Sequence, residues 1–482
     1  MTASAPLGCD VALARAARRA AGSTRPRMAL ATSILASSLA FVDGSVVNVG
    51  LPAIGRSLRA GPEALQWTIN AYLLPLSALL LLGGALGDRY GRGRMLTLGV
   101  VLFAATSAAC AAAPDVAWLL AARGLQGVGA ALVLPNSLAI LGGAFEGEAR
   151  GRAIGLWAAA SAMASALGPV LGGWLIDVSG WRAIFLINLP LALAAVGFAL
   201  AGVRDPPRQA PAAPLDLAGA VLGAAALGGL AWALTLGSGP AGWTPLAIGL
   251  GLGGAGLGAA FVGVEMRLGE RAMTPPALFG SRQLAALNLM TFLLYGALGG
   301  FLVLLPYVLI SGAGYGATAA GAALLPFPLV MAAGGPVTGA LAGRFGARPL
   351  LVAGSVIVAV GLLAALRVDA RGAYATGVLP CVLLVALGMT CAAAPLTTAV
   401  LAAAGERQAG SASGLNSAVA RAGGLAATAL LGAVLSARGA GLTAAFHAAA
   451  VAGAVVALAA AASAGWGLRA PATGDRVPPP RA

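Results

Sequence analysis

Lysine is absent from this sequence of 482 residues, and charge of either sign is scarce. Only 9% of the residues are charged, whereas 59% are hydrophobic and the mean hydropathy is +0.91. Soluble domains carry about 25% charged residues, so this composition excludes a large soluble domain. The lack of lysine also excludes the Gly-x4-Gly-Lys-Ser/Thr loop, and with it an ATP-driven pump built on that motif. We expect an all-α polytopic membrane protein.

Residues that build metal or catalytic sites are equally scarce. The four cysteines, Cys9, Cys110, Cys381 and Cys391, lack metal-ligand spacing and mostly lie in apolar runs, so they indicate neither a disulfide nor a metal site. The single histidine, His447, has no acidic neighbour in sequence and is interpreted as a helix-end residue. A polytopic membrane enzyme would need clustered acids, histidines or a metal. We therefore expect no catalytic residues, no metal and no cofactor.

What the sequence has in abundance is long apolar runs. A bilayer crossing takes about 20 residues, and runs of this length predict fourteen transmembrane helices. They lie near 28–50, 64–87, 95–113, 116–141, 153–176, 183–203, 217–237, 246–266, 285–310, 318–342, 350–368, 376–402, 416–436 and 445–468. Residues 1–27 lack a cleavable apolar core and are not a signal peptide. The proline-rich tail 469–482 is expected to be disordered.

The 29 basic residues are all arginines, and their placement predicts an orientation. Twenty-two of them, Arg421 included, are assigned to the termini and the loops on the same side, six to the opposite loops, and Arg123 alone to a span. Clustering in short segments between apolar runs is typical of orientation signals rather than of nucleic-acid binding. An even helix count puts both termini on one side. We expect both in the cytoplasm, with the chain in the cytoplasmic (inner) membrane.

An internal repeat predicts the domain organisation. Residues 84–94, Gly-Ala-Leu-Gly-Asp-Arg-Tyr-Gly-Arg-Gly-Arg, return in weaker form at 339–348, 255 residues later. The second copy falls eight helices after the first, whereas two six-helix halves would place it six helices later. We therefore expect six-helix bundles at 28–203 and 285–468, with a helix pair at 217–266 inserted between them. Repeated halves with a binding site between them are common in secondary transporters.

Five segments in chain order carry a resemblance to a known family. They are 41–52, 65–72, 84–94, 123–129, and 168–173 followed by 180–190. With fourteen helices, they resemble the major facilitator superfamily, and within it the fourteen-helix drug/proton antiporters of the EmrB/QacA type. A weaker match runs through Asp216, Glu265 and 410–424. The resemblance implies a major facilitator fold and transport driven by the proton gradient.

The resemblance also implies roles for two of these segments. The turn at 84–94 would be a gating loop that breaks and re-forms during transport, through Gly84, Asp88, Arg89, Gly91 and Arg92. The 168–173 segment resembles a helix-5 motif associated with antiporters, formed by Gly168, Pro169, Gly172 and Gly173. Each has a simpler interpretation: a turn whose charges only set orientation, and close packing of small residues.

Asp43 and Arg123 are the charges that we place well inside the predicted spans. Each lies seven residues from the end of its predicted helix, and the two ends are on the same side of the membrane. At the rise of an α-helix, this places both residues at a depth of about 11 Å. The resemblance implies that both helices line a central cavity, where the two side chains could meet. Desolvation favours a protonated carboxyl, and a nearby arginine favours a charged one, so opening to either side would load or release a proton. A static ion pair is the alternative.

The substrate is predicted only by class. No acidic residue lies in the predicted helices 9 and 10, which disfavours a dication. Polar and aromatic residues assigned to a substrate cavity are Gln66, Tyr72, Asn136, Asn288 and Tyr295, although packing explains any one of them. We expect proton-coupled export of small amphipathic drugs, antibiotics or secondary metabolites. A facilitator-fold importer or symporter of a polar metabolite is the alternative. The expected partners are lipid bilayer, substrate and protons, and a periplasmic adaptor is left open.

Overall fold

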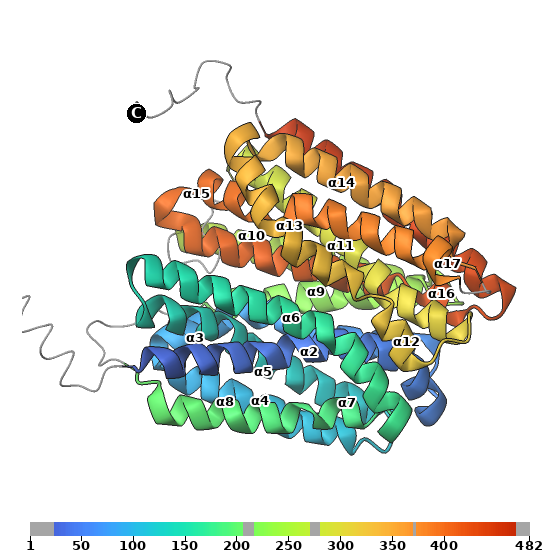
Figure 1. The fold of residues 1–482 in the computed structure, drawn as a ribbon, viewed down its shortest axis with the longest axis horizontal. Helices are drawn as coiled ribbons and strands as arrows, with labels where there is room; N and C mark the ends of the chain where they lie inside the picture. The colour runs from blue at the N-terminus through green and yellow to red at the C-terminus, as the bar shows by residue number, and fades with distance from the viewer. Residues whose placement is uncertain (1–23, 206–215, 270–279, 370–372, 469–482) are drawn as a thin grey trace, which may run out of the picture.

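The computed structural model of the chain describes residues 24–205, 216–269, 280–369 and 373–468. In these ranges the chain is helical and forms no strand, and fourteen helical segments are long and apolar enough to span a membrane. The all-α fold and the helix count expected from the sequence are confirmed. The predicted N-terminal segment up to residue 23 and the predicted tail 469–482 lie outside the described residues. Figure 1 shows the helices running nearly parallel along the long axis.

The first six spans form the N-terminal half of the bundle. They are α2 (Pro26–Leu58), α3 (Pro62–Tyr90), α4 (Arg92–Ala111), α5 (Val116–Ala144), α6 (Gly147–Ser179), and the pair α7 (Ala183–Leu186) and α8 (Asn188–Gly202). The sixth predicted helix is therefore interrupted, at Ile187. Proline in the first turn starts α2 and α3, where its missing N–H would be unpaired in any case. The Asp115 carboxylate caps α5 by accepting from the Trp118 amide at 2.8 Å.

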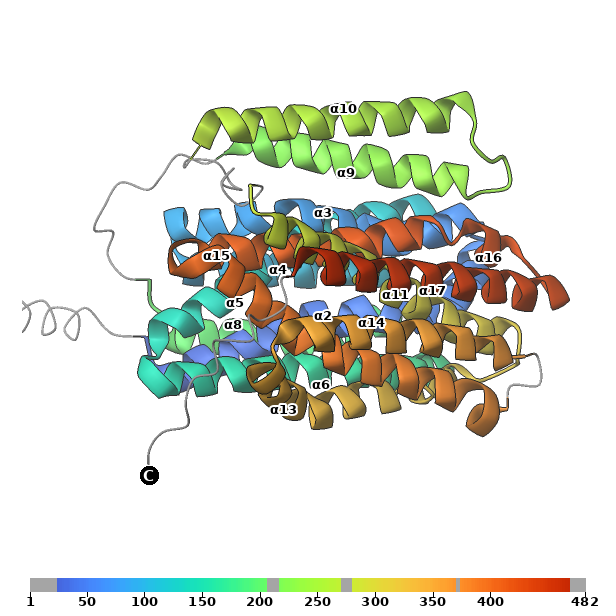
Figure 2. The same cartoon turned by 90° about the horizontal axis from the view of Figure 1, so that it is seen from above.

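The next two spans, α9 (Leu217–Gly237) and α10 (Pro245–Leu268), pack against each other beside the bundle. Of the two, α9 contacts α3 in the N-terminal half and α15 in the C-terminal half, and α10 lies against α9. Figure 2 shows both helices along one edge of the molecule, outside the other spans. The assignment of 217–266 as an inserted pair stays a prediction, with which this peripheral position agrees.

The C-terminal half contains the last six spans. They are built from α11 (Arg282–Ser311), α12 (Ala317–Ala322), α13 (Pro326–Phe345), α14 (Ala347–Ala364) with a 3-10 turn at Ala365–Arg367, a π-helical turn at Tyr374–Val378, α15 (Leu379–Ala429), α16 (Gly432–Ser436) and α17 (Ala440–Gly467). The tenth predicted helix is divided into α12 and α13. The division between predicted helices 12 and 13 is absent, because the backbone stays helical through all 51 residues of α15.

Helix α15 nevertheless takes part in two membrane spans: Tyr374–Ala404, which begins in the π-helical turn, and Ala412–Ser436, which ends with α16. At 1.5 Å per residue its 51 residues measure about 76 Å, more than twice the ~30 Å apolar core of a bilayer. The first span packs on α14 and the second on α11. The second span includes Arg421, which we counted with a cytoplasmic segment although the predicted helix 416–436 also contains it. That assignment is wrong, and the arginine split becomes 21 to 6.

The sequence repeat corresponds to a repeated turn. Helix α3 ends at Tyr90 and α4 begins at Arg92, with only Gly91 between them at φ 103°. Helix α13 ends at Phe345 and α14 begins at Ala347, with Gly346 between them at φ 80°. Both glycines occupy the positive-φ region that side chains disfavour. The two copies therefore share a one-residue turn, and most of 84–94 is helical rather than an open loop.

Glycines also allow neighbouring helices to approach closely in both halves. A Cβ atom at Gly388 of α15 would lie 2.6 Å from the Gly354 carbonyl oxygen, and a Cβ at Gly354 of α14 would lie 2.7 Å from the Gly388 carbonyl oxygen. The corresponding contacts in the N-terminal half join Gly99 of α4 and Gly129 of α5. Membrane helices associate through this kind of close packing, since burial from water does not drive them together.

We expect Gly388→Leu to destabilise the C-terminal half. The new side chain would meet backbone atoms of α14, so the two helices would have to separate. Overpacking of this kind costs about 1–3 kcal/mol. Thermal unfolding in detergent should show a lower unfolding temperature than for wild type. The control is Gly253→Leu in α10, where an added Cβ meets no atom within 4 Å. Equal unfolding temperatures for the two variants would contradict the tight α14–α15 contact.

Candidate functional site

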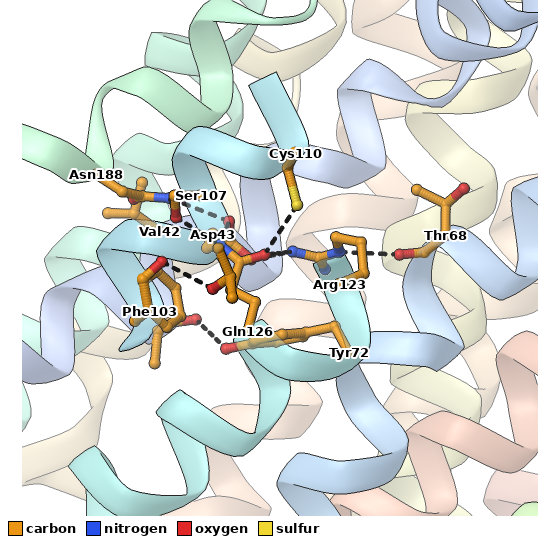
Figure 3. Close-up of polar contacts among 12 residues, drawn as sticks. Val42, Asp43, Thr68, Tyr72, Phe103, Ser107, Cys110, Arg123, Gln126 and Asn188 are labelled. Carbon is orange, nitrogen blue, oxygen red and sulfur yellow. Dashed lines mark hydrogen bonds and ion pairs between the residues drawn. The ribbon is translucent and has the colours of Figure 1, made fainter. Parts of the chain in front are cut away.

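An ion pair between Asp43 of α2 and Arg123 of α5 lies inside the N-terminal half. The Asp43 side chain is fully buried and that of Arg123 is 1% exposed. The Arg123 Nη1 donates to Asp43 Oδ2. The structure thus brings together the two residues that equal depth in the membrane had placed within reach. Figure 3 shows the pair at the centre of a polar cluster among the helices.

Two amide side chains hold the second carboxylate oxygen of Asp43. Gln126 Nε2 donates to Asp43 Oδ1 at 2.9 Å, and Asn188 Nδ2 donates to the same atom at 3.1 Å. Both amides also donate to Ser107 Oγ, at 2.8 and 3.2 Å. The cluster therefore joins α2, α4, α5 and α8 (Figure 3). Every hydrogen bond that Asp43 receives from the described residues comes from an N–H donor, and a carboxylate oxygen accepts it.

Arg123 has further partners that do not involve Asp43. Its Nε donates to the Thr68 carbonyl oxygen at 3.1 Å, and its Nη1 donates to Gln126 Oε1 at 2.7 Å. The guanidinium carbon lies 4.4 Å from the centre of the Tyr72 ring and 5.8 Å from that of Phe185. Aromatic faces attract cations. The arginine is thus fixed in place whether or not Asp43 carries charge.

Sequence reasoning did not assign three members of this cluster. Gln126 stood in a segment of the family resemblance, three residues after Arg123, and that i, i+3 spacing puts both on one helix face. Asn188 stood in another such segment. Ser107 lies in an apolar run and carried no signal. The positions of Ser107 and Asn188 depend on how α4 and α8 pack, and spacing along the sequence carries no information about that packing.

The segment predicted to be a gate lies at the membrane side of the chain ends (Figure 1). Arg92 Nε donates to Asp88 Oδ1 at 2.9 Å, and Arg92 Nη1 donates to the Ala139 carbonyl oxygen at 3.1 Å. The side chains of Arg92 and Asp88 are 43% and 64% exposed, so their ion pair is open to solvent. Asp88 thus pairs with the arginine four residues after it. The gating role of Gly84, Asp88, Arg89, Gly91 and Arg92 stays a prediction.

The cap of α4 comes from a residue that the sequence did not single out. Asp205, just after α8, accepts from the Gly93 amide at 2.7 Å and from the Arg94 amide at 3.1 Å. A carboxylate at a helix N-terminus bonds free amides and complements the helix dipole. A Cβ at Gly91 would lie 2.4 Å from Asp205 Oδ2, so this position also needs glycine for space.

The predicted helix-5 motif contacts both halves of the molecule. A Cβ at Gly172 would lie 1.9 Å from Val46 Cγ2 of α2, and one at Gly168 would lie 2.0 Å from Ser45 Oγ. On the other side, a Cβ at Gly173 would meet the Ala317 carbonyl oxygen of α12 at 2.3 Å, and one at Gly321 would meet the Pro169 carbonyl oxygen at 2.1 Å. The motif therefore lies where α2 and α12 both approach α6.

A carboxylate strengthens this contact between the halves. Asp177, near the end of α6, accepts from the Thr318 amide at 2.9 Å and from the Thr318 hydroxyl at 2.6 Å. It also accepts from the Ala317 amide at 3.3 Å, at the start of α12. These bonds join the halves on the side opposite the described chain ends, where α6 meets α12 in Figure 1.

The residues assigned to a substrate cavity occupy two kinds of position. Gln66, Tyr72 and Asn136 are buried, and each bonds within the protein: to Ala429 O, Ala40 O and Gly83 O at 3.2, 3.1 and 2.9 Å. Asn288 and Tyr295 of α11 are partly buried, and Asn288 Oδ1 accepts from Asn416 Nδ2 at 3.1 Å. Their role in binding stays a prediction.

Comparison with known proteins agrees with this architecture. The family model described as Major Facilitator Superfamily matches residues 33–266 and 287–481. "Multidrug resistance protein Stp" of Mycobacterium tuberculosis is 35% identical, over 82% of this chain and 73% of its own length. "Methylenomycin A resistance protein" of Bacillus subtilis is 33% identical over 82% and 85%. "Cephamycin export protein CmcT" of Amycolatopsis lactamdurans is 34% identical over 84% of each.

Solved structures show the same fold at low sequence identity. A bacterial homologue of the human lysosomal transporter Spinster, in an inward-facing and occupied conformation, superposes with a TM-score of 0.64 at 16% identity, covering 91% of this chain and 96% of its own. An auto-inhibited peptide transporter of the POT family superposes with a TM-score of 0.66 at 17% identity, covering 94% and 98%. This likeness concerns the arrangement of the helices.

We expect Arg123→Met to be strongly destabilising. It leaves Asp43 buried without its cation, and breaking a buried ion pair in this way costs about 3–5 kcal/mol. The double variant Asp43→Asn/Arg123→Met removes both charges and should recover part of the loss. Thermal unfolding in detergent compares the two variants. A double variant that is no more stable than Arg123→Met would show that the two charges do not stabilise each other.

Proposed function

The chain belongs to the Major Facilitator Superfamily, and we propose that it exports small amphipathic compounds in exchange for protons, by alternating access. The observation that carries this proposal is the buried Asp43–Arg123 pair with its shell of amide and hydroxyl groups. Ionisable groups at membrane depth are costly, and in membrane proteins they mark ion and substrate pathways. The curated relatives at 33–35% identity are named as resistance and export proteins, which supports export over uptake.

The pair supplies the two states that proton coupling needs. In this structure Asp43 accepts hydrogen bonds from Arg123, Gln126 and Asn188. A proton on Asp43 would break its contact with Arg123, while Arg123 keeps the Thr68 carbonyl, Gln126 and the Tyr72 ring. The loaded state is thus tolerated without rebuilding the site. Protonation then changes how α2 and α5 are held together, which links the proton to helix movement.

The free energy of proton entry is large enough to contribute to export. A proton moving inward gains about 2.3 kcal/mol per 100 mV of membrane potential and about 1.4 kcal/mol per unit of pH difference. We place the protein in the cytoplasmic membrane with both termini inside, on the 21 to 6 arginine split. In that orientation the contact of Asp177 with α12 lies at the outer face and closes it. In this proposal, closure of the outer face belongs to the state that loads a compound from the cytoplasmic side.

The helix-5 segment supports the same cycle. Gly168 and Gly172 fit against α2, the helix that carries Asp43, while Gly173 and Pro169 fit against α12 of the other half. A movement of α2 on proton loading is therefore transmitted to the contact that closes the outer face. The lipid bilayer surrounds the spans, and protons and the amphipathic compound are the partners of this cycle.

We expect Asp43→Asn to abolish proton-driven export while leaving the protein in the membrane. The amide keeps the shape of the side chain but does not exchange a proton in the physiological range. Everted vesicles that hold the variant should fail to accumulate a dye or antibiotic against its gradient, and should still exchange labelled for unlabelled compound without a pH gradient. Glu63→Gln, an exposed carboxyl at the start of α3, is the matched control and should transport normally.

Uphill transport by Asp43→Asn at the wild-type rate would remove Asp43 from the proton pathway. Accumulation in whole cells, combined with loss from everted vesicles, would instead identify an importer. The compound for these assays is selected by testing the antibiotic susceptibility of a host that lacks its own efflux pumps and expresses this protein.

A further inference from the structure

Arg421 is a third charged residue at membrane depth, besides Asp43 and Arg123. It lies in the span Ala412–Ser436, nine residues after its start and three before its midpoint. At 1.5 Å per residue this is about 13 Å from the end of the span. A charge so deep in a membrane helix is expensive, and it faces a protein interior or a water-filled space rather than lipid.

The helical repeat shows which way Arg421 faces. Gly414, Arg421 and Thr428 are spaced seven residues apart, so they lie on one face of α15. A Cβ at Gly414 would lie 2.7 Å from Leu81 Cδ2, and the Thr428 hydroxyl donates to Asn70 Oδ1. Leu81 and Asn70 both belong to α3. Arg421 therefore lies between two contacts that join the halves, on the face of α15 turned towards the N-terminal half.

Among the residues that the structure describes, Arg421 has no carboxylate partner. The titratable group that acts on its guanidinium electrostatically is Tyr72 of α3, whose hydroxyl already donates to the Ala40 carbonyl. In the described part of the chain, no ion pair and no hydrogen-bond acceptor contacts the guanidinium. The buried acid of the other half, Asp43, is neutralised by Arg123. The space between α3 and α15 therefore has one net positive charge.

Chemistry identifies what such a charge would bind. A guanidinium offers five donors in a planar fork that matches a carboxylate, and it stays charged at any physiological pH. We propose that Arg421 is the anion-recognition residue of the substrate site, so that the preferred compound is amphipathic and carries a carboxylate or a similar acidic oxygen. This inference rests on the proposed export function and names its substrate class. With a negative interior, the membrane potential itself assists the exit of an anion.

A group of polar side chains in the same half fits this assignment: Asn288 and Asn416 are partly buried, and Thr291 is fully buried. Asn416, Asn288 and Thr291 form a hydrogen-bonded group in which Asn416 Nδ2 donates to Asn288 Oδ1 at 3.1 Å and to Thr291 Oγ1 at 2.7 Å. Asn416 lies five residues before Arg421 on α15, and Asn288 and Thr291 lie on α11. They supply neutral polarity without a negative charge. Among the described side chains, an acidic head group would therefore meet the Arg421 cation and these neutral polar groups.

The test compares one ligand with and without its charge. Purified full-length protein in nanodiscs is titrated with 4-(1-pyrenyl)butyrate and with its primary amide, and pyrene anisotropy measures binding. Wild type should bind the carboxylate about tenfold or more tightly than the amide, as expected for a charge-assisted hydrogen bond. Arg421→Gln should bind both equally, with its amide affinity unchanged. Arg421→Lys should keep a preference for the carboxylate.

Two comparisons make the result decisive. Arg438, which follows α16, donates to the Leu435 and Ala437 carbonyl oxygens. The variant Arg438→Gln removes this arginine and should keep the wild-type preference for the carboxylate. Unchanged amide binding by Arg421→Gln shows that this variant is folded. A preference in Arg421→Gln equal to wild type overturns the proposal, as does a wild type that binds neither probe or prefers neither. If Arg421→Gln does not fold, Arg421→Lys decides: a smaller carboxylate preference at unchanged amide affinity supports the proposal, since lysine lacks the planar fork, and a preference equal to wild type overturns it.

Binding and transport separate the two proposals. The binding preference needs no proton gradient, so it can hold even if proton-driven export fails. Proton-driven export of neutral and acidic compounds alike, without a binding preference, would overturn only the substrate class.

Discussion

The contact between the Asp43 carboxylate and the Arg123 guanidinium constrains the whole N-terminal half. Both side chains are buried, so each requires the other and a set of polar partners. Gln126 and Asn188 satisfy the free carboxylate oxygen, and Ser107 accepts from both of their amides. The helices that carry these residues are thereby fixed in mutual position. A proton is the smallest change that can loosen this arrangement, because it removes one charge and leaves the other well supported.

The contacts between the two halves are the contacts on which loosening of the ion pair can act. Small residues of α6 lie against α2 on one side and α12 on the other, and Asp177 bonds to the first residues of α12. The face of α15 that carries Arg421 lies against α3. The proton site lies within one half, whereas the cation that we assign to substrate binding extends from the other half. Separate sites allow a proton and a compound to act on the same two halves in turn.

Much of this organisation is readable from the sequence, and the reason is physical. Length and hydropathy define a span, so fourteen helices and the fold class were predictable, and equal depth brought Asp43 and Arg123 within reach. Helix boundaries were less secure, because helix continues through the polar residues beyond a span. That is why α15 is unbroken. The Arg421 assignment was wrong for another reason, because an arginine inside the predicted helix 416–436 was counted as an orientation signal. The Asp205 cap of α4 was unpredictable, since more than 100 residues separate the partners and only the packing of α8 joins them.

Proton release on ligand binding tests the central claim most directly. Purified protein in weakly buffered detergent solution, with a pH-indicating dye, is mixed with a compound that it exports. If Asp43 exchanges its proton against substrate, wild type releases protons on binding and Asp43→Asn binds the compound without releasing any. Equal release by the two proteins, or binding without release by wild type, would contradict the account.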